Sequence, residues 1–142
     1  MTTEQIHAIA WLNRAYLARL KVDALIAQQE ELRANAERNT LALGNTGASS
    51  SAKADNSTEN VLIELVDLTN KIATEIKAQN QIYNEVNSVV NDVEDITLQT
   101  VLRYRYLCYH KWQTIAELMN YDERTIRRKH KQAIDEVVRK CP

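Results

Sequence analysis

Cationic side chains recur at helical spacing near the end of this 142-residue chain. Together with one threonine, the candidate binding residues are Arg124, Thr125, Arg127, Arg128 and Lys131. Steps of three and four residues place such side chains on one side of a helix. The planar guanidinium group of arginine can bond the O6 and N7 atoms of guanine, and lysine can neutralise phosphate. The chemistry that this pattern favours is therefore recognition of a polyanion.

A lysine- and arginine-rich helix can also be a solvated face without a ligand. The distribution of charge argues against this alternative. Residues 1–95 hold 8 Lys and Arg against 14 Asp and Glu, a net charge of −6, whereas residues 96–142 hold 10 against 5, a net charge of +5. Only the C-terminal part is therefore expected to attract a polyanion.

The cationic side chains require a helix that is held from behind, and the spacing predicts one over residues 123–138. Its inward face is marked by Ile126, Ala133, Ile134 and Val137. Asp122 can accept the backbone N–H groups that open this helix, and Glu123 adds negative charge to its first turn. Asn120 is a residue type that ends helices in the left-handed conformation, so we expect the chain to turn there.

Two shorter helices are predicted before this turn. The first covers residues 96–107, and Asp92, Glu94 or Asp95 can cap its start. Cys108, Tyr109 and His110 interrupt the pattern. The second has an apolar face of Trp112, Ile115, Ala116, Leu118 and Met119. Two short helices joined by a turn, with the second cationic and capped, form the arrangement that places a recognition helix in the major groove of DNA.

The segment WQTIAELMNYDERTIRRKHKQAI resembles the region-4 helix-turn-helix of sigma-70-type factors. With its long helical preface, the chain resembles phage-encoded transcriptional regulators of the ArpU-like, late-transcription activator type. This resemblance implies that Arg124, Thr125, Arg127, Arg128 and Lys131 face DNA. It also implies that the module is held together by Trp112, Ile115, Ala116, Ile126 and Ala133. The chain departs from the usual pattern, in which glycine is common in each turn, by having Tyr109-His110 and Asn120 there.

The preceding residues, 1–95, predict a two-helix arm. Apolar residues recur at helical intervals from about Thr3 to Arg38, and again from Ser57 or Thr58 to about Val93. The second set forms a stripe: Val61, Leu65, Leu68, Ile72, Ile76, Gln79, Tyr83, Val86, Val89 and Val93. Residues 39–57 are rich in Gly, Ser, Ala, Thr and Asn, which favours a flexible linker. We therefore expect an all-α chain: a long antiparallel, coiled-coil-like helical hairpin, then the helix-turn-helix of residues 96–142.

Other chemistry has little support in the sequence. His7, His110 and His130 are far apart, with no carboxylate or cysteine at ligand spacing, and we expect His130 to pack beside the helix that contains Trp112. Cys108 and Cys141 form no disulfide framework, and no phosphate-binding loop or nucleophile motif is present. We expect no enzyme activity, metal or cofactor, no signal peptide or membrane helix, and a location in the cytoplasm of a bacterial host cell.

The leading hypothesis is a sequence-specific transcriptional regulator, encoded by a phage or prophage, that reads the major groove of double-stranded DNA. The arm is expected to make it a homo-oligomer, with a dimer favoured, and RNA polymerase is a possible second partner. One alternative is the recognition subunit of a viral DNA-packaging machine, similar to a small terminase and assembled as a ring. Another is a helical adaptor that binds RNA polymerase or a different acidic protein surface.

Overall fold

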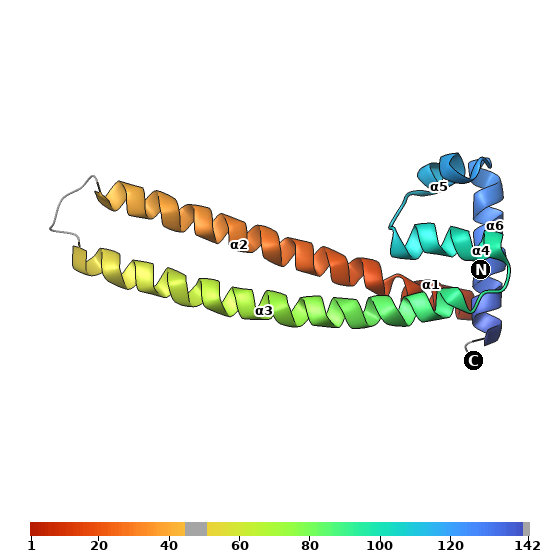
Figure 1. Cartoon of the computed structure of the whole chain (residues 1–142), viewed down its shortest axis with the longest axis horizontal. Coiled ribbons are helices and arrows are strands. Elements are labelled where there is room, and N and C mark those ends of the chain that lie inside the picture. The colour runs from red at the N-terminus through yellow and green to blue at the C-terminus, as the bar shows by residue number, and fades with distance from the viewer. Residues whose placement is uncertain (45–50, 141–142) are drawn as a thin grey trace. The chain divides into compact units, whose positions relative to one another are not determined.

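The structure, a computed structural model, describes the backbone of residues 1–44 and 51–140 and the side chains of residues 1–39 and 58–140 (Figure 1). Its elements are α1 (Thr3–Leu12), α2 (Arg14–Gly44), α3 (Ser51–Asn91), α4 (Ile96–Leu102), the π-helix η2 (Arg103–Leu107), α5 (Trp112–Met119) and α6 (Glu123–Lys140). No strand occurs within those two ranges, and the all-α class is confirmed.

The chain divides into two compact units. Unit 1 comprises Met1–Arg19 and Gln79–Pro142, and unit 2 comprises Leu20–Ala78. Both α2 and α3 begin in one unit and continue into the other, so the chain enters unit 2 along one helix and leaves it along the next. Each unit has its own buried apolar cluster.

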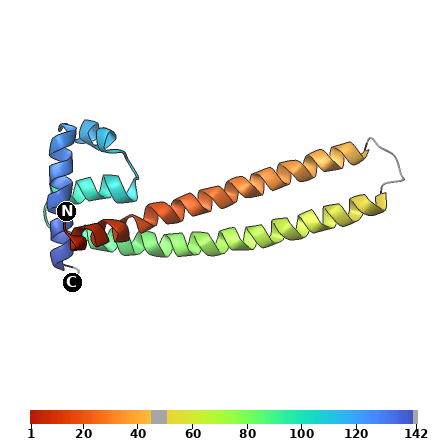
Figure 2. The same ribbon diagram turned by 180° about the vertical axis from the view of Figure 1, so that it is seen from behind.

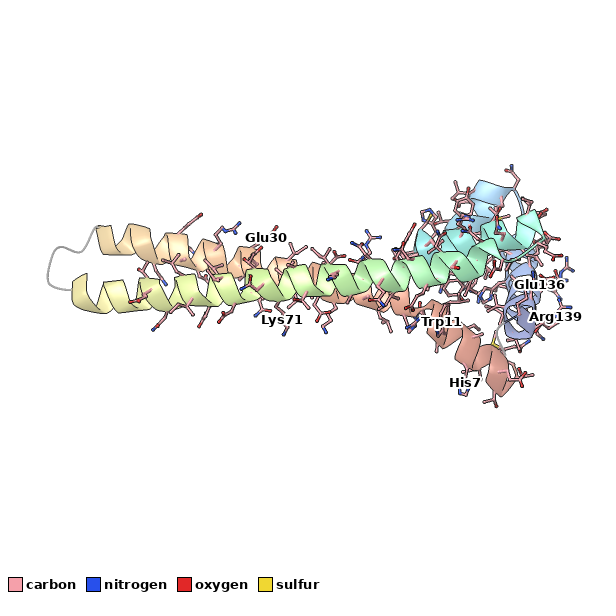
Figure 3. All side chains as sticks on the ribbon, turned by 60° about the horizontal axis from the view of Figure 1, so that its bottom comes forward. His7, Trp11, Glu30, Lys71, Glu136 and Arg139 are labelled. Atoms are coloured by element: carbon pink, nitrogen blue, oxygen red, sulfur yellow. The ribbon has the colours of Figure 1, made fainter. Side chains whose placement is uncertain are left out.

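In unit 2, α2 and α3 run side by side in opposite directions (Figures 1 and 2). Leu25 from α2 packs with Leu68 and Ile72 from α3. At the edges of this small core, Lys21 pairs with Glu75 at 3.0 Å, and the Gln29 amide donates to the Thr69 hydroxyl at 2.7 Å. Other charged side chains of the two helices, such as Glu30 and Lys71, are exposed (Figure 3).

Unit 1 is built around α6, against which α1, α4 and α5 pack. Its main core joins segments from both ends of the chain: Leu12, Ala15, Val86, Val90, Val93, Leu98, Leu102, Tyr106, Leu107, Ala133, Ile134 and Val137. A polar contact adds to this packing, because the buried Gln5 amide donates to the Asp135 carboxylate. The N-terminal helix is therefore fastened to the cationic helix by apolar and polar contacts.

The first long helix differs from the prediction because it is interrupted at Asn13. Thr2 and Gln5 form a capping box that starts α1, and Asn13 ends it before α2 begins at Arg14. The Arg14 side chain donates to the Trp11 carbonyl at 3.1 Å and lies over the Trp11 ring, 4.6 Å from its centroid. These side-chain contacts hold the local geometry at a break that apolar periodicity does not reveal.

The predicted linker over residues 39–57 is wrong at both of its ends. Helix α2 continues to Gly44 and α3 already begins at Ser51, so positions 57 and 58 lie inside a helix and not at its start. Residues 45–50 lie outside the described part of the chain. The composition of this segment favoured a loop. Alanine, however, is strongly favourable in helices, and serine and asparagine are only mildly unfavourable.

The predicted apolar stripe of the second helix is only partly buried. Leu68, Ile72, Val86 and Val93 are buried, and so is Val90, which the stripe omitted. In contrast, Ile76 and Tyr83 are each 39% exposed. On the first long segment the buried apolar residues are Leu12, Ala15, Val22 and Leu25, whereas Leu17 and Leu20 are exposed. Spacing alone identified the helices but not the exact faces that pack.

The sequence placed a domain boundary at residue 95, but the packing of unit 1 includes residues on both sides of it. Val86, Val90 and Val93 share a core with Leu102 and Ile134.

None of the helices that the structure describes is long and apolar enough to cross a membrane.

Candidate nucleic-acid interface

Helices α5 and α6 meet over a small core of their own. Ile115 and Ala116 from α5 pack with Ile126 from α6 and Val101 from α4, and all four are buried. Trp112, Met119 and Tyr104 cover the edges of this cluster. The amphipathic pattern predicted for residues 112–119 is confirmed, with Leu118 as an exception because its side chain is 52% exposed.

The connection between α5 and α6 is the three-residue turn 120–122. Asn120 has φ 58° and ψ 41°, the left-handed conformation that was predicted for it. The Tyr121 N–H donates to the Ala116 carbonyl at 3.0 Å, which closes the end of α5. The turn therefore ends one helix and reverses the chain before the next begins.

Asp122 caps α6 as the sequence predicted. Its carboxylate accepts the Thr125 backbone N–H at 2.9 Å. A hydrogen bond from the Thr125 side chain, followed by that from its backbone, holds the pKa of Asp122 below its ordinary value. The carboxylate is thereby kept charged at the positive end of the helix, where negative charge is favourable.

Arg124, Arg128 and Lys131 are exposed on α6. None of these three side chains forms a hydrogen bond or ion pair with another residue that the structure describes, although Arg128 lies close enough to Asp122 to stabilise its carboxylate. On the opposite side of α6, Ile126, Ala133 and Ile134 are fully buried. The packing of the helix therefore fixes which face it offers, and that face is cationic.

Arg127 differs from the other candidate residues. Its guanidinium pairs with the Glu123 carboxylate at 2.9 Å and lies over the Trp112 ring, 5.6 Å from the centroid. Thr125 is half-buried, and its backbone N–H is engaged by Asp122. The sequence grouped all five candidates by spacing, but the structure separates three unpaired cations from two residues that already have local contacts.

Behind Arg127 lies a buried aromatic cluster. The Tyr106 hydroxyl and the His130 Nε2 atom are 2.6 Å apart, and the His130 ring meets the Trp112 ring edge-on at a centroid distance of 4.5 Å. Burial, followed by the positive charges of Arg105 and Arg127, lowers the pKa of His130 to about 4. Burial also raises the pKa of Tyr106. The prediction that His130 packs beside α5 is confirmed, and its imidazole is neutral at pH 7.

Two further cationic side chains near α5 and α6 were not predicted from the sequence to be binding residues. Arg105 lies over the Trp112 ring, 4.3 Å from the centroid, and donates to the His110 carbonyl at 3.0 Å. Lys129 lies over the Tyr121 ring at 5.1 Å. Both contacts join residues on different elements, so no regular spacing in the sequence indicates them.

The two turns in which this chain lacks the glycine common in sigma-70 region 4 each contain a residue with positive φ. Tyr109 has φ 62° and Asn120 has φ 58°, and they are the non-glycine residues with positive φ among those described. The Tyr109 ring is held by Tyr16, at a centroid distance of 5.6 Å, and by Arg19, at 5.0 Å. Burial raises the pKa of the Tyr109 hydroxyl. Side-chain packing thus holds tyrosine at a backbone geometry that glycine adopts more readily.

Within the described residues, no group of three or more His, Cys, Asp or Glu side chains could hold a metal ion. The cationic face of α6 and the aromatic cluster behind it lie side by side on unit 1. Comparison with known proteins gave no match to a family model, to a curated protein or to a solved structure.

Proposed function

We propose that this protein is a sequence-specific transcriptional regulator that binds double-stranded DNA through the N-terminal half of α6. The observation that carries the proposal is the set of unpaired cations Arg124, Arg128 and Lys131 on a helix whose other face is buried. Unpaired arginines on a fixed helix can bond guanine edges without first breaking internal ion pairs. Lys131 lies further along the helix and is assigned to phosphate.

The local geometry of α5 and α6 supports this assignment. A helix of eight residues, a three-residue turn and a capped second helix of 18 residues correspond to a helix-turn-helix in which α6 is the recognition helix. The similarity of residues 112–134 to region 4 of sigma-70-type factors points the same way. In this proposal Arg127 contacts DNA phosphate while Glu123 and Trp112 orient its side chain, and Thr125 lies at the start of the recognition helix.

The proposal extends to assembly and source. In this proposal α2 and α3 act as a coiled-coil-like helical hairpin that makes the protein a homodimer, so that two copies of α6 address two half-sites. Exposed apolar side chains on α3, namely Leu62, Ile63 and Val66, support association because each is more than half exposed. The protein is proposed to be phage- or prophage-encoded, to act in the cytoplasm of a bacterial host, and to have RNA polymerase as a further partner.

Binding to a pool of random duplex DNA tests the function. The full chain is expected to enrich a sequence with two related half-sites. With the enriched duplex in a fluorescence-anisotropy titration, Arg124→Ala or Arg128→Ala should each cost about 1–3 kcal/mol of binding free energy and relax specificity. Lys131→Ala should weaken all duplexes evenly and reduce the slope of log K against log salt by about 0.9.

The matched control is Arg139→Ala. Arg139 is an exposed arginine of the same helix, but it lies in the last turn and pairs with Glu136 at 3.2 Å (Figure 3). Its replacement should leave duplex affinity unchanged. Unchanged affinity in both Arg124→Ala and Arg128→Ala would exclude α6 as the reading helix. No binding to any duplex at low salt would contradict the DNA function and favour an adaptor, and a ring of eight or more subunits by light scattering would favour DNA packaging.

A further inference from the structure

Unit 1 contains a hollow of about 320 Å³ beside the cationic helix. Residues from both ends of the chain line it: Met1, Ile9, Asn13, Arg105, Tyr106, Trp112, Arg127 and His130. Its volume falls at the lower end of the range of about 300–1,000 Å³ that is typical of small-molecule sites. The hollow is therefore large enough for a small ring compound.

The walls of the hollow combine flat apolar surfaces with cationic groups. Trp112, Tyr106 and His130 supply aromatic rings, and Met1 and Ile9 supply aliphatic surface. The guanidinium groups of Arg105 and Arg127 both lie over the Trp112 ring, at 4.3 and 5.6 Å from its centroid. This combination of aromatic surface and convergent cationic groups suits a ligand that carries both a flat ring and a negative charge.

The positive charge of the hollow is only weakly neutralised. None of the side chains that line it is acidic. Arg105 donates to a backbone carbonyl, that of His110, and pairs with no carboxylate that the structure describes. Arg127 pairs with Glu123, but the two side chains are 58% and 49% exposed, so water weakens their attraction. A ligand carboxylate can take the place of Glu123 at little cost.

The low pKa of the buried His130 is consistent with a net positive charge in the hollow. After burial, Arg105 and Arg127 are the causes that keep its pKa low. The same two positive charges that disfavour a protonated imidazole favour an anion in the hollow. His130 is neutral at pH 7 and so adds an aromatic wall and no competing charge.

We propose that this hollow binds a small aromatic carboxylate. The carboxylate accepts hydrogen bonds from the Arg105 and Arg127 guanidinium groups, and the ring lies against Trp112. Charge-assisted hydrogen bonds of this kind are among the stronger polar contacts in proteins. Asn13, which also lines the hollow, provides a polar group from the N-terminal segment.

The proposal is tested by titrating the full chain with naphthoate, without DNA, and following the indole N–H signals in ¹H–¹⁵N NMR spectra. The chain has two tryptophans, so the variant Trp11→Phe assigns the Trp112 signal. Naphthoate should shift this signal in a saturable way, with a Kd of about 1 mM or tighter. Neutral naphthamide and inorganic phosphate, at the same concentrations, should give no saturable shift.

Variants at the two arginines identify the anion contacts. Arg105→Gln and Arg127→Gln should each weaken naphthoate binding by about tenfold or more, because each removes a charged hydrogen-bond donor. Arg139→Gln, which removes an arginine of α6 that does not line the hollow, should bind naphthoate like the parent. A thermal melt checks that each variant folds, and since Arg127 is largely exposed, its variant provides the test if Arg105→Gln does not fold.

Three outcomes would overturn the proposal. These are the absence of a saturable shift with naphthoate, equally tight binding of naphthamide, and an equal shift with phosphate alone. The consequence for DNA rests on the proposed function: bound naphthoate holds Arg127 and should weaken duplex affinity in the parent but not in Arg127→Gln. Because the NMR titration contains no DNA, failure of the DNA function leaves the ligand test intact, and the reverse also holds.

Discussion

The side chain of His130 is surrounded by groups that disfavour its protonation. Its ring is buried against Trp112, its Nε2 atom lies 2.6 Å from the Tyr106 hydroxyl, and the positive charges of Arg105 and Arg127 disfavour its protonated form. Because a buried hydroxyl and a buried ring nitrogen satisfy each other, the pair costs little in its neutral form. A proton on His130 would instead place three positive charges close together.

This environment predicts a loss of stability in mild acid. The pKa of His130 is about 4 in the folded protein and 6.5 without the fold, so between these values only the unfolded chain binds the proton. The free energy of unfolding should therefore fall as pH drops from about 6.5 towards 4, by up to roughly 3 kcal/mol. Urea titrations monitored by circular dichroism between pH 7.5 and pH 4, in steps of roughly half a unit, measure this decline.

Two variants test whether His130 causes this loss of stability in acid. His130→Gln keeps a polar partner for Tyr106 but cannot titrate in this range, so it should be less stable at pH 7 and show a flatter profile. His7→Gln removes an exposed imidazole from α1 and should keep the profile of the parent. A His130→Gln profile as steep as that of the parent would mean that other groups cause the acid sensitivity.

At the level of elements, the turns on either side of α5 depend on positive φ at Tyr109 and Asn120. The two residues are held differently. The Tyr109 ring packs with Tyr16 and Arg19, whereas Asn120 is exposed and is suited to the turn by its backbone preference. The orientation of α6 relative to α5 therefore depends on a local backbone conformation at Asn120.

Substitutions at Asn120 should separate backbone preference from side-chain contacts. Asn120→Ala should lower the free energy of unfolding by about 1 kcal/mol, because alanine pays the steric cost of left-handed backbone. Asn120→Gly should be as stable as the parent or slightly more so, since glycine adopts φ near 60° freely. Asn13 ends α1 with φ −72°, so Asn13→Ala provides a control that incurs no such cost. If Asn120→Ala is as stable as Asn120→Gly, the turn does not depend on this conformation.

At the scale of the whole molecule, the candidate DNA-binding helices share their core with segments that are distant in sequence. Leu12 and Ala15 come from the N-terminal helices, and Val86 and Val90 come from the end of α3. These side chains are fully buried in the cluster that includes Leu102 and Ile134. Residues 96–142 by themselves would expose one side of this cluster.

Truncation tests this dependence. A fragment of residues 96–142 should be largely unfolded by circular dichroism, because several buried apolar side chains lose their partners at about 1.5–3 kcal/mol each. The control is a variant that keeps unit 1 and replaces residues 20–78 with a flexible Gly/Ser linker. This variant should unfold cooperatively. A fragment 96–142 that melts at the temperature of the full chain would show that the C-terminal helices fold independently.

Several features of the candidate site could be predicted from the sequence because they depend on neighbours a few residues away. The presence of α5, the cap at Asp122 and the turn at Asn120 all follow from local hydrogen bonding and backbone preference, and Asp95 is one of the three residues predicted as the cap of α4. The buried face of α6 follows from the spacing of Ile126, Ala133, Ile134 and Val137. The same periodicity places the exposed residues Arg124, Arg128 and Lys131 on the opposite face of the helix.

Only the tertiary structure decided the features that join distant segments. It places Arg127 over the Trp112 ring, brings Asn13 and Arg105 around one hollow, and includes residues 1–19 in the unit that contains α6. It also selects Val90 in place of Ile76 and Tyr83 for burial on α3. Helical spacing allows more than one apolar face on such helices, and the choice between them is made by the side chains against which each helix packs.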